Sequence, residues 1–131
     1  MMELCRCHSR KLYKDCCKKF HDGEKPATAE QLMRSRYCAY AMGLADYIMK
    51  TTHVKNPRYQ KDQEKWKNEI LLFSRGTVFE DLAILDFVDG QKEAFVTFKA
   101  TLKQGDQDAS FTEKSRFLKE DGQWLYVNYE I

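Results

Sequence analysis

The chain has 131 residues, of which 43% are hydrophobic and 32% are charged, and its net charge at pH 7 is +2. This length suits one compact core, and no apolar run approaches the eighteen or more residues that a membrane-spanning helix needs. We therefore expect a soluble protein without membrane contact. The small net charge also argues against an electric field of the whole protein that attracts nucleic acid.

A cluster of cysteines near the N-terminus is the sharpest chemical signal in the chain. Cys5 and Cys7 form a C-x-C pair, and eight residues later Cys16 and Cys17 are adjacent. Four thiolates make a complete tetrahedral shell for Zn2+, with no position left for a reacting water. We therefore predict a structural zinc ion, which the adjacent pair can bind if it opens a short helix.

Disulfides are the alternative for this cluster. No signal peptide is recognisable before the first cysteine, so we expect a reducing, cytoplasmic setting in which such spacing favours a metal. His8 and His21 are reserve ligands, because imidazole also binds zinc. Cys38 stands apart, and we interpret it as a small residue that packs a helix.

The N-terminal segment is basic. Residues 1–20 hold six Lys or Arg against two acidic residues, whereas a zinc ion with four thiolates carries −2 of its own. Basic groups that offset this anionic cluster are the interpretation that we favour. A weak binding surface for RNA, a ribosome or an acidic partner is the alternative.

The first helix is expected after a linker at residues 20–26. Thr28 is a suitable N-cap, Gln31 completes a capping box, and the helix is predicted to run to about Gly43. Arg36 falls in the middle of the apolar stripe, and Arg34 lies on its flank. The stripe itself has helical spacing and comprises Ala29, Leu32, Met33, Tyr37, Tyr40 and Leu44.

Two further helices complete the helical part. A short one is predicted over residues 46–50. A longer one is predicted from Asn56-Pro57, an N-cap followed by proline, to about Phe73. The longer helix should bury Tyr59, Trp66, Ile70 and Phe73.

From Thr77 onward, apolar residues recur with a period of two, which is typical of strands. Asp89-Gly90 and Asp121-Gly122 are strong hairpin signals, and Gly105 marks a longer turn. The expected strands are residues 78–88, 92–103, 109–120 and 123–130. We therefore predict an α+β fold: a cone of about three helices packed on a curved antiparallel sheet of four or more strands, with a small N-terminal zinc module.

Several polar residues could gather inside this cone. Alternation along the third strand places Phe111, Glu113, Ser115 and Phe117 on one face, which we assign to the concave side. We expect a hydrogen-bonded cluster between helices and sheet, serving structure or a pocket. Its predicted members are Arg34, Arg36, Tyr37, Tyr40, Thr52, His53, Trp66, Glu113 and Ser115.

Arg36 and Glu113 are the expected ion pair of this cluster. A guanidinium in an apolar helical stripe keeps its proton and therefore needs a hydrogen-bond acceptor. A carboxylate on the concave face can accept two parallel hydrogen bonds from it. An enzyme would use His53 or Glu113 as general base. We expect no catalysis, because no nucleophile–base pair or open metal site is evident from the spacing.

The chain resembles the YchJ-like family of bacterial proteins. The cysteine spacing is similar to the SEC-C motif, the zinc-binding tail of the protein-export ATPase SecA. Further segments of the resemblance follow in order: His21-Asp22-Gly23, residues 26–37 with the run Leu32-Met33-Arg34-Ser35-Arg36-Tyr37, Thr51-Thr52-His53, and residues 113–117. The resemblance covers nearly the whole chain.

The resemblance implies a SEC-C-like zinc module at residues 1–22 and a nuclear-transport-factor-two-like (NTF2-like, SnoaL-like) cone at residues 23–131. SEC-C motifs usually read Cys-Pro-Cys-Gly-Ser-Gly, whereas Arg6, His8 and Arg10 replace the proline and both glycines here. If either glycine position needs a positive φ, the loop is strained or reshaped.

Three functions from different classes stay open. The first is a binding or adaptor protein with a protein partner, and the resemblance to SecA favours protein or ribosome binding. The second is a small-molecule-binding protein or enzyme that uses a pocket in the cone. The third is an RNA- or ribosome-associated protein that uses the basic N-terminal module.

Overall fold

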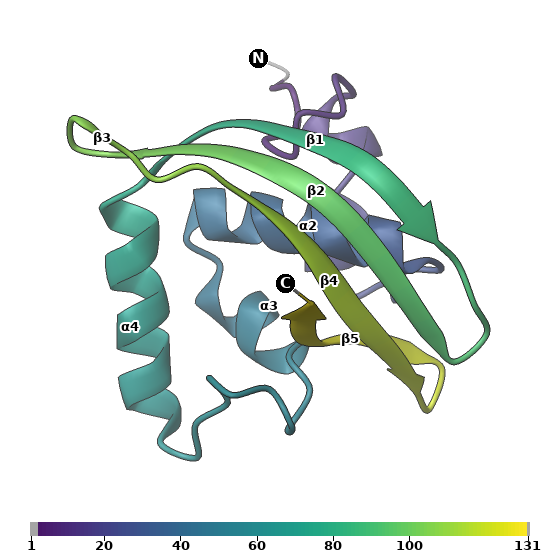
Figure 1. Ribbon diagram of the computed structural model, residues 1–131. Coiled ribbons are helices and arrows are strands. Elements are labelled where there is room, and N and C mark those ends of the chain that lie inside the picture. Colours follow the sequence, from purple (N-terminus) through teal and green to yellow (C-terminus); the bar gives the residue numbers. More distant parts are fainter. Residues whose placement is uncertain (1–2, 131) are drawn as a thin grey trace.

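The computed structural model describes residues 3–130, and these form one α+β domain in which helices pack on one face of a curved sheet (Figure 1). The helical part comprises the 3-10 helix η1 (Tyr13–Asp15) and the α-helices α1 (Lys18–His21), α2 (Ala29–Met42), α3 (Ala45–Lys50) and α4 (Gln63–Arg75). None of the described helices is long and apolar enough to cross a membrane.

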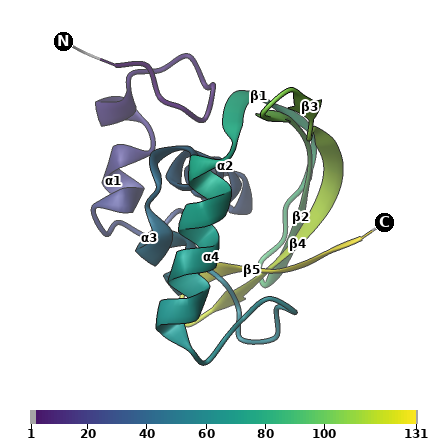
Figure 2. The same cartoon turned by 90° about the vertical axis from the view of Figure 1, so that its left-hand side faces the viewer.

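The sheet is antiparallel and follows the helices in the chain. Its strands are β1 (Val78–Val88), β2 (Glu93–Gln104), β3 (Gln107–Asp108), β4 (Phe111–Glu120) and β5 (Gln123–Glu130). The order is β1-β2-β4-β5, and the short β3 pairs with β2. Seen from the side, the sheet curves around α2 and α4, and the N-terminal loop lies on the other side of α2 (Figure 2).

Helix α2 forms as the sequence predicts, because both of its ends carry the expected signals. The Thr28 hydroxyl accepts a hydrogen bond from the Gln31 amide at 3.2 Å, and the Gln31 side chain accepts one from the Thr28 amide in return. Gly43 ends the helix with a φ of 72°, a conformation that costs glycine little.

The predicted start of the last helix is wrong. Helix α4 begins at Gln63, and its N-cap is Asp62, which accepts a hydrogen bond from the Lys65 amide at 3.1 Å. Asn56 instead holds the preceding loop on the sheet, because its Nδ2 donates to the Val127 carbonyl at 2.7 Å. A side chain that satisfies a strand carbonyl took precedence over the local capping signal.

The interior of α4 follows the prediction in part. Trp66 and Ile70 are buried, and Tyr59 packs edge-on against Trp66, whereas Phe73 remains 38% exposed.

The strands agree closely with the period-two pattern. Asp121 and Gly122 have φ values of 53° and 77° at the last hairpin, as a tight turn between twisted strands requires. Ser115 and Phe117 are buried on the concave face as predicted. Phe111, assigned to the same face, is 42% exposed at the start of β4, where it contacts Phe98.

Arg36 is buried as predicted, but its partner was predicted wrongly. No ion pair joins Arg36 to Glu113, although both side chains lie within the described residues. Instead, Nη1 of Arg36 donates to the Ile48 carbonyl at 3.1 Å and to the hydroxyls of Thr51 and Thr52 at 2.8 and 3.0 Å. The C-terminal end of α3, which carries partial negative charge, therefore takes the place of the carboxylate.

Tyr126 lies between the two groups that were expected to pair. Its ring contacts the Arg36 guanidinium at 4.9 Å, and its hydroxyl donates to Glu113 at 3.0 Å. Burial raises the pKa of Tyr126, so this hydroxyl stays protonated. Glu113 also accepts a hydrogen bond from Ser115. Helix and sheet are thus joined through an aromatic ring rather than by a direct ion pair.

We predict that Arg36 and Glu113 contribute to stability almost independently. Arg36→Met should lower the free energy of unfolding by about 2–3 kcal/mol, because it removes charged hydrogen bonds without stranding an acceptor. Glu113→Gln should cost less than about 1 kcal/mol, and the coupling in a double-mutant cycle should stay below about 1 kcal/mol, because the two residues share Tyr126 without bonding to each other. Urea unfolding of the two single variants and the double variant measures these energies. A coupling above about 2 kcal/mol would indicate a direct ion pair between Arg36 and Glu113 and contradict the prediction.

Candidate metal centre

The four clustered cysteines converge as a metal site requires. The sulfur atoms of Cys5, Cys7, Cys16 and Cys17 all lie within 4.8 Å of one another. The Sγ atoms of Cys7 and Cys16 are 3.6 Å apart, and those of Cys16 and Cys17 are 3.9 Å apart. A tetrahedral zinc ion with Zn–S bonds of about 2.3 Å needs edges of about 3.8 Å, so these residues fit the ion.

The backbone closes a loop around this cluster. The Cys5 amide donates to the Lys11 carbonyl at 2.8 Å, and the Tyr13 amide donates to the Glu3 carbonyl at 2.9 Å. Cys17 is the N-cap of α1, so the second pair opens a short helix as the sequence analysis required. We refer to residues 3–21 as the knuckle.

Two residues of the knuckle have an unusual backbone. His8 has a φ of 62° and Arg10 a φ of 70°, in the left-handed region that favours glycine. These are the positions at which SEC-C motifs carry glycine. Non-glycine residues therefore hold a strained conformation at these two positions.

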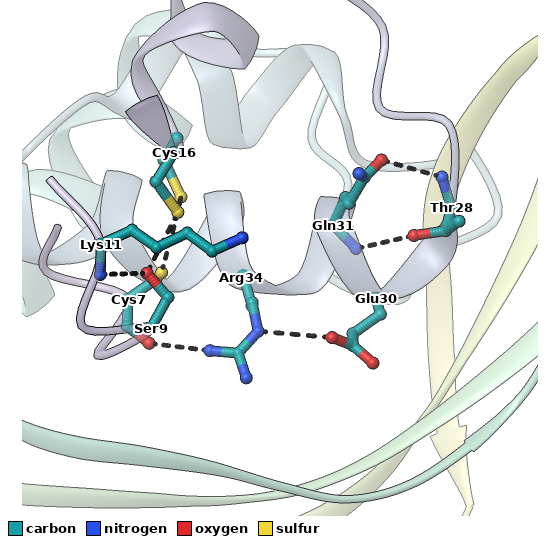
Figure 3. A network of polar contacts seen from close by, with 9 residues as sticks. Cys7, Ser9, Lys11, Cys16, Thr28, Glu30, Gln31 and Arg34 are labelled. Carbon is teal, nitrogen blue, oxygen red and sulfur yellow. Dashed lines mark hydrogen bonds and ion pairs between the residues drawn. The ribbon is translucent and has the colours of Figure 1, made fainter. Parts of the chain in front are cut away.

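Helix α2 carries the knuckle through side-chain-to-backbone hydrogen bonds. Nη1 of Arg34 donates to the Cys7 carbonyl at 3.2 Å while its Nε lies 3.5 Å from Glu30, so that Arg34 bridges loop and helix (Figure 3). Nη1 of Arg6 donates to the Ala41 carbonyl at 3.1 Å. The loop is thus bonded to α2 at two positions, Arg34 and, near the end of the helix, Ala41.

The two reserve histidines are used for packing. Nδ1 of His21 accepts from the Tyr13 hydroxyl at 2.7 Å, and its Nε2 donates to the Ser35 carbonyl at 2.9 Å. Burial lowers the pKa of His21, which keeps the ring neutral in this arrangement. Nε2 of His8 lies 3.3 Å from the Phe79 carbonyl on β1. Both rings therefore tie the knuckle to the domain and stay outside the sulfur shell.

Cys38 is a packing residue of α2, as predicted, but the sequence did not indicate that it lies beside the cysteine cluster. It is fully buried in α2, and its sulfur lies 3.7 Å from that of Cys5. No local spacing announces this contact, because 33 residues separate the two cysteines. The cluster therefore contains a fifth sulfur.

The predicted polar cluster forms in part. Tyr37 donates to the Asp81 carbonyl at 2.9 Å, and Tyr40 packs edge-on against Phe73. Arg34 serves the knuckle, Arg36 and Thr52 bond to each other, and Glu113 and Ser115 form the sheet side of the Tyr126 contact. The expectation that Tyr37, Thr52, His53 and Ser115 share one region is met in part: Thr52 and Ser115 are joined through Arg36, Tyr126 and Glu113, whereas Tyr37 bonds to β1 at another place.

A cavity of about 420 Å³ is lined by three of the predicted residues, Thr52, His53 and Trp66. Lys50, Tyr59 and Glu120 also line it. Nε2 of His53 is 2.6 Å from a Glu120 carboxylate oxygen. Sequence reasoning missed Glu120, because nothing in the pattern of β4 indicates that its last residue meets the loop after α3.

A second recess, of about 300 Å³, lies on the knuckle. Leu4, Cys5, Arg6, His8 and Arg10 line it, and the Leu4 side chain is 63% exposed. The recess is therefore both apolar and basic, and Cys5 of the sulfur cluster lines it.

Comparison with known proteins matches both parts of this arrangement. Residues 28–128 match the family model described as "YchJ, middle NTF2-like domain". The solution structure of a SEC-C motif containing protein from Rhodopseudomonas palustris aligns with a TM-score of 0.81 and 30% sequence identity over 98% of each chain. The crystal structure of a SEC-C motif containing protein from Psychrobacter arcticus aligns with a TM-score of 0.74 and 27% identity, over 98% of this chain and 82% of that chain.

We predict that glycine at position 10 strengthens metal binding. Arg10→Gly relieves a left-handed conformation worth about 1 kcal/mol, and the greater freedom of unfolded glycine offsets part of this gain. Zinc affinity in competition with a chelator should therefore rise up to about fivefold. Lys11→Gly is the matched control, since Lys11 is an exposed neighbour without a positive φ. This variant gains only the flexibility of glycine, so its affinity for zinc should fall. An equal loss of zinc affinity in the two variants would show that the backbone at Arg10 is not strained.

Proposed function

Because the chain belongs to the YchJ-like family of SEC-C motif proteins, we propose that it is a zinc-stabilised adaptor that binds another protein through its knuckle. Four thiolates favour zinc and leave no open position, so the metal would fold the loop and take no part in a reaction. A loop of about twenty residues cannot build a sufficient core of its own, and metal binding would supply its folding free energy.

The recess on the knuckle is the observation that carries this proposal. It combines the exposed Leu4 side chain with the guanidinium groups of Arg6 and Arg10. An acidic segment of a partner protein with one apolar anchor fits this chemistry, because the anchor fills the recess and carboxylates meet the arginines.

RNA fits the recess less well. Binding of single-stranded RNA relies on aromatic side chains on which bases stack. Of the described residues that line the recess, only His8 carries a ring, and that ring packs edge-on against Tyr37. The basic charge alone would support a weak, salt-sensitive contact with phosphates.

We predict that the recess governs capture of a protein partner. Leu4→Ser combined with Arg10→Glu should reduce capture from a native bacterial lysate at least about tenfold, by removing the anchor and reversing a charge. Leu85→Ser combined with Lys61→Glu is the control, because it makes the same kinds of change at exposed residues outside the recess. Equal capture by both variants would contradict the proposal, and loss of capture after nuclease treatment would favour RNA.

A small-molecule site in the cavity beside His53 is the second candidate function. The Lys55 amide donates to Nδ1 of His53 at 3.0 Å, which leaves the proton on Nε2 to bond Glu120. Trp66 is only 5% exposed, yet none of the described residues accepts a hydrogen bond from its indole N–H. Since no buried side-chain nitrogen within the described residues lacks a partner, this N–H reaches solvent, and Trp66 lines the cavity.

The indole N–H and Lys50 are donors that suit a small aromatic carboxylate. We predict that benzoate shifts the indole N–H signal of Trp66 in the NMR spectrum. Trp124 is the internal control, because its indole N–H bonds to the Ala27 carbonyl at 3.2 Å and should not move. Unchanged signals at millimolar benzoate, or equal shifts of both, would remove this candidate.

A further inference from the structure

The metal cluster has one sulfur more than a tetrahedral ion can bind. Cys38 belongs to the same buried group as Cys5, Cys7 and Cys17, whereas Cys16 is half-buried at its edge. The distance of 3.7 Å between the sulfurs of Cys38 and Cys5 matches the edge of about 3.8 Å expected between two ligands of one zinc ion. It also lies between the separations of 3.6 and 3.9 Å found for two pairs of the predicted ligand set.

Cys16 and Cys38 approach the cluster from different elements. Cys16 lies in the loop before α1, where the Ser9 hydroxyl is 3.2 Å from its sulfur. Cys38 lies in α2, where its sulfur is 3.6 Å from that of Met42. Cys5 contacts the Cys38 thiol, and Cys7 and Cys17 contact that of Cys16.

We propose that Cys38 is an alternative fourth ligand, which replaces Cys16 while Cys5, Cys7 and Cys17 hold the metal throughout. In the exchange, the bond from zinc to the Cys16 sulfur breaks and the bond to the Cys38 sulfur forms. The thiol proton of Cys38 passes through solvent to the released Cys16 thiolate, so charge and protons balance. The inference rests on metal binding at the cluster, as proposed above.

This arrangement has a consequence for the knuckle. Cys16 is the more accessible of the two exchanging thiols, and Cys38 is fully buried. A metal that moves toward Cys38 would be held by a residue of α2 itself. The knuckle would then keep its metal, and its attachment to the domain, when Cys16 is unavailable.

Cobalt substitution tests the exchange, because the visible and charge-transfer absorption of Co2+ distinguishes four thiolate ligands from three. Wild-type protein should show four. Cys16→Ala should also show four, with a metal affinity lowered at most about tenfold. Cys16→Ala combined with Cys38→Ala should show three, with an affinity lowered by about 100-fold or more.

Cys7→Ala is the matched control. Cys7 is held in common by both arrangements, and the Cys38 sulfur adjoins that of Cys5 instead, so this variant should show three thiolates. Three thiolates in Cys16→Ala, or failure of that variant to load metal, would overturn the exchange. A wild-type protein that loads no metal would instead refute the metal site itself, so the two failures are distinguishable.

Discussion

The contact between the sulfur cluster and α2 is the interaction on which the position of the knuckle depends. One face of α2 carries Arg34, Ser35 and Cys38, which hold the knuckle. Arg36 and Tyr37 lie on another face of α2, where Arg36 bonds to α3 and Tyr37 bonds to the sheet. Residues three and four apart share a helical face, so one helix serves both partners at once. The knuckle is therefore positioned by the same element that organises the core.

Polar contacts tie α2 and α3 to the sheet inside the domain. Arg36 bonds to the C-terminal end of α3, and Tyr126 separates it from Glu113. These groups satisfy one another, as buried polar groups must. The cavity beside His53 adjoins this network at Thr52, and Glu120 is the partner of His53 there. The recess on the knuckle and this cavity are thus separate surfaces with different chemistry.

Much of the fold could be predicted from the sequence, because its local signals agree with the tertiary structure. The capping box at Thr28 and the hairpin at Asp121-Gly122 fix the ends of their elements within the chain itself. The four clustered cysteines were likewise evident from spacing, whereas the boundary between module and domain near residue 22 stays a prediction. What failed was long-range: the partner of Arg36, the role of Asn56 and the position of Cys38 depend on residues far apart in sequence. Periodicity gives the face on which a side chain lies, but not which of several acceptors it meets.

Hydrogen exchange before and after chelation tests most directly the claim that a zinc cluster holds the knuckle on α2. Protein purified without chelator should contain about one zinc ion per chain. After the metal is removed, amide protection should fall over residues 5–21 and over residues 34–42 of α2, while the strands stay protected because the domain retains its own core. Full protection of residues 5–21 without metal, or an unchanged α2 after chelation, would contradict the account.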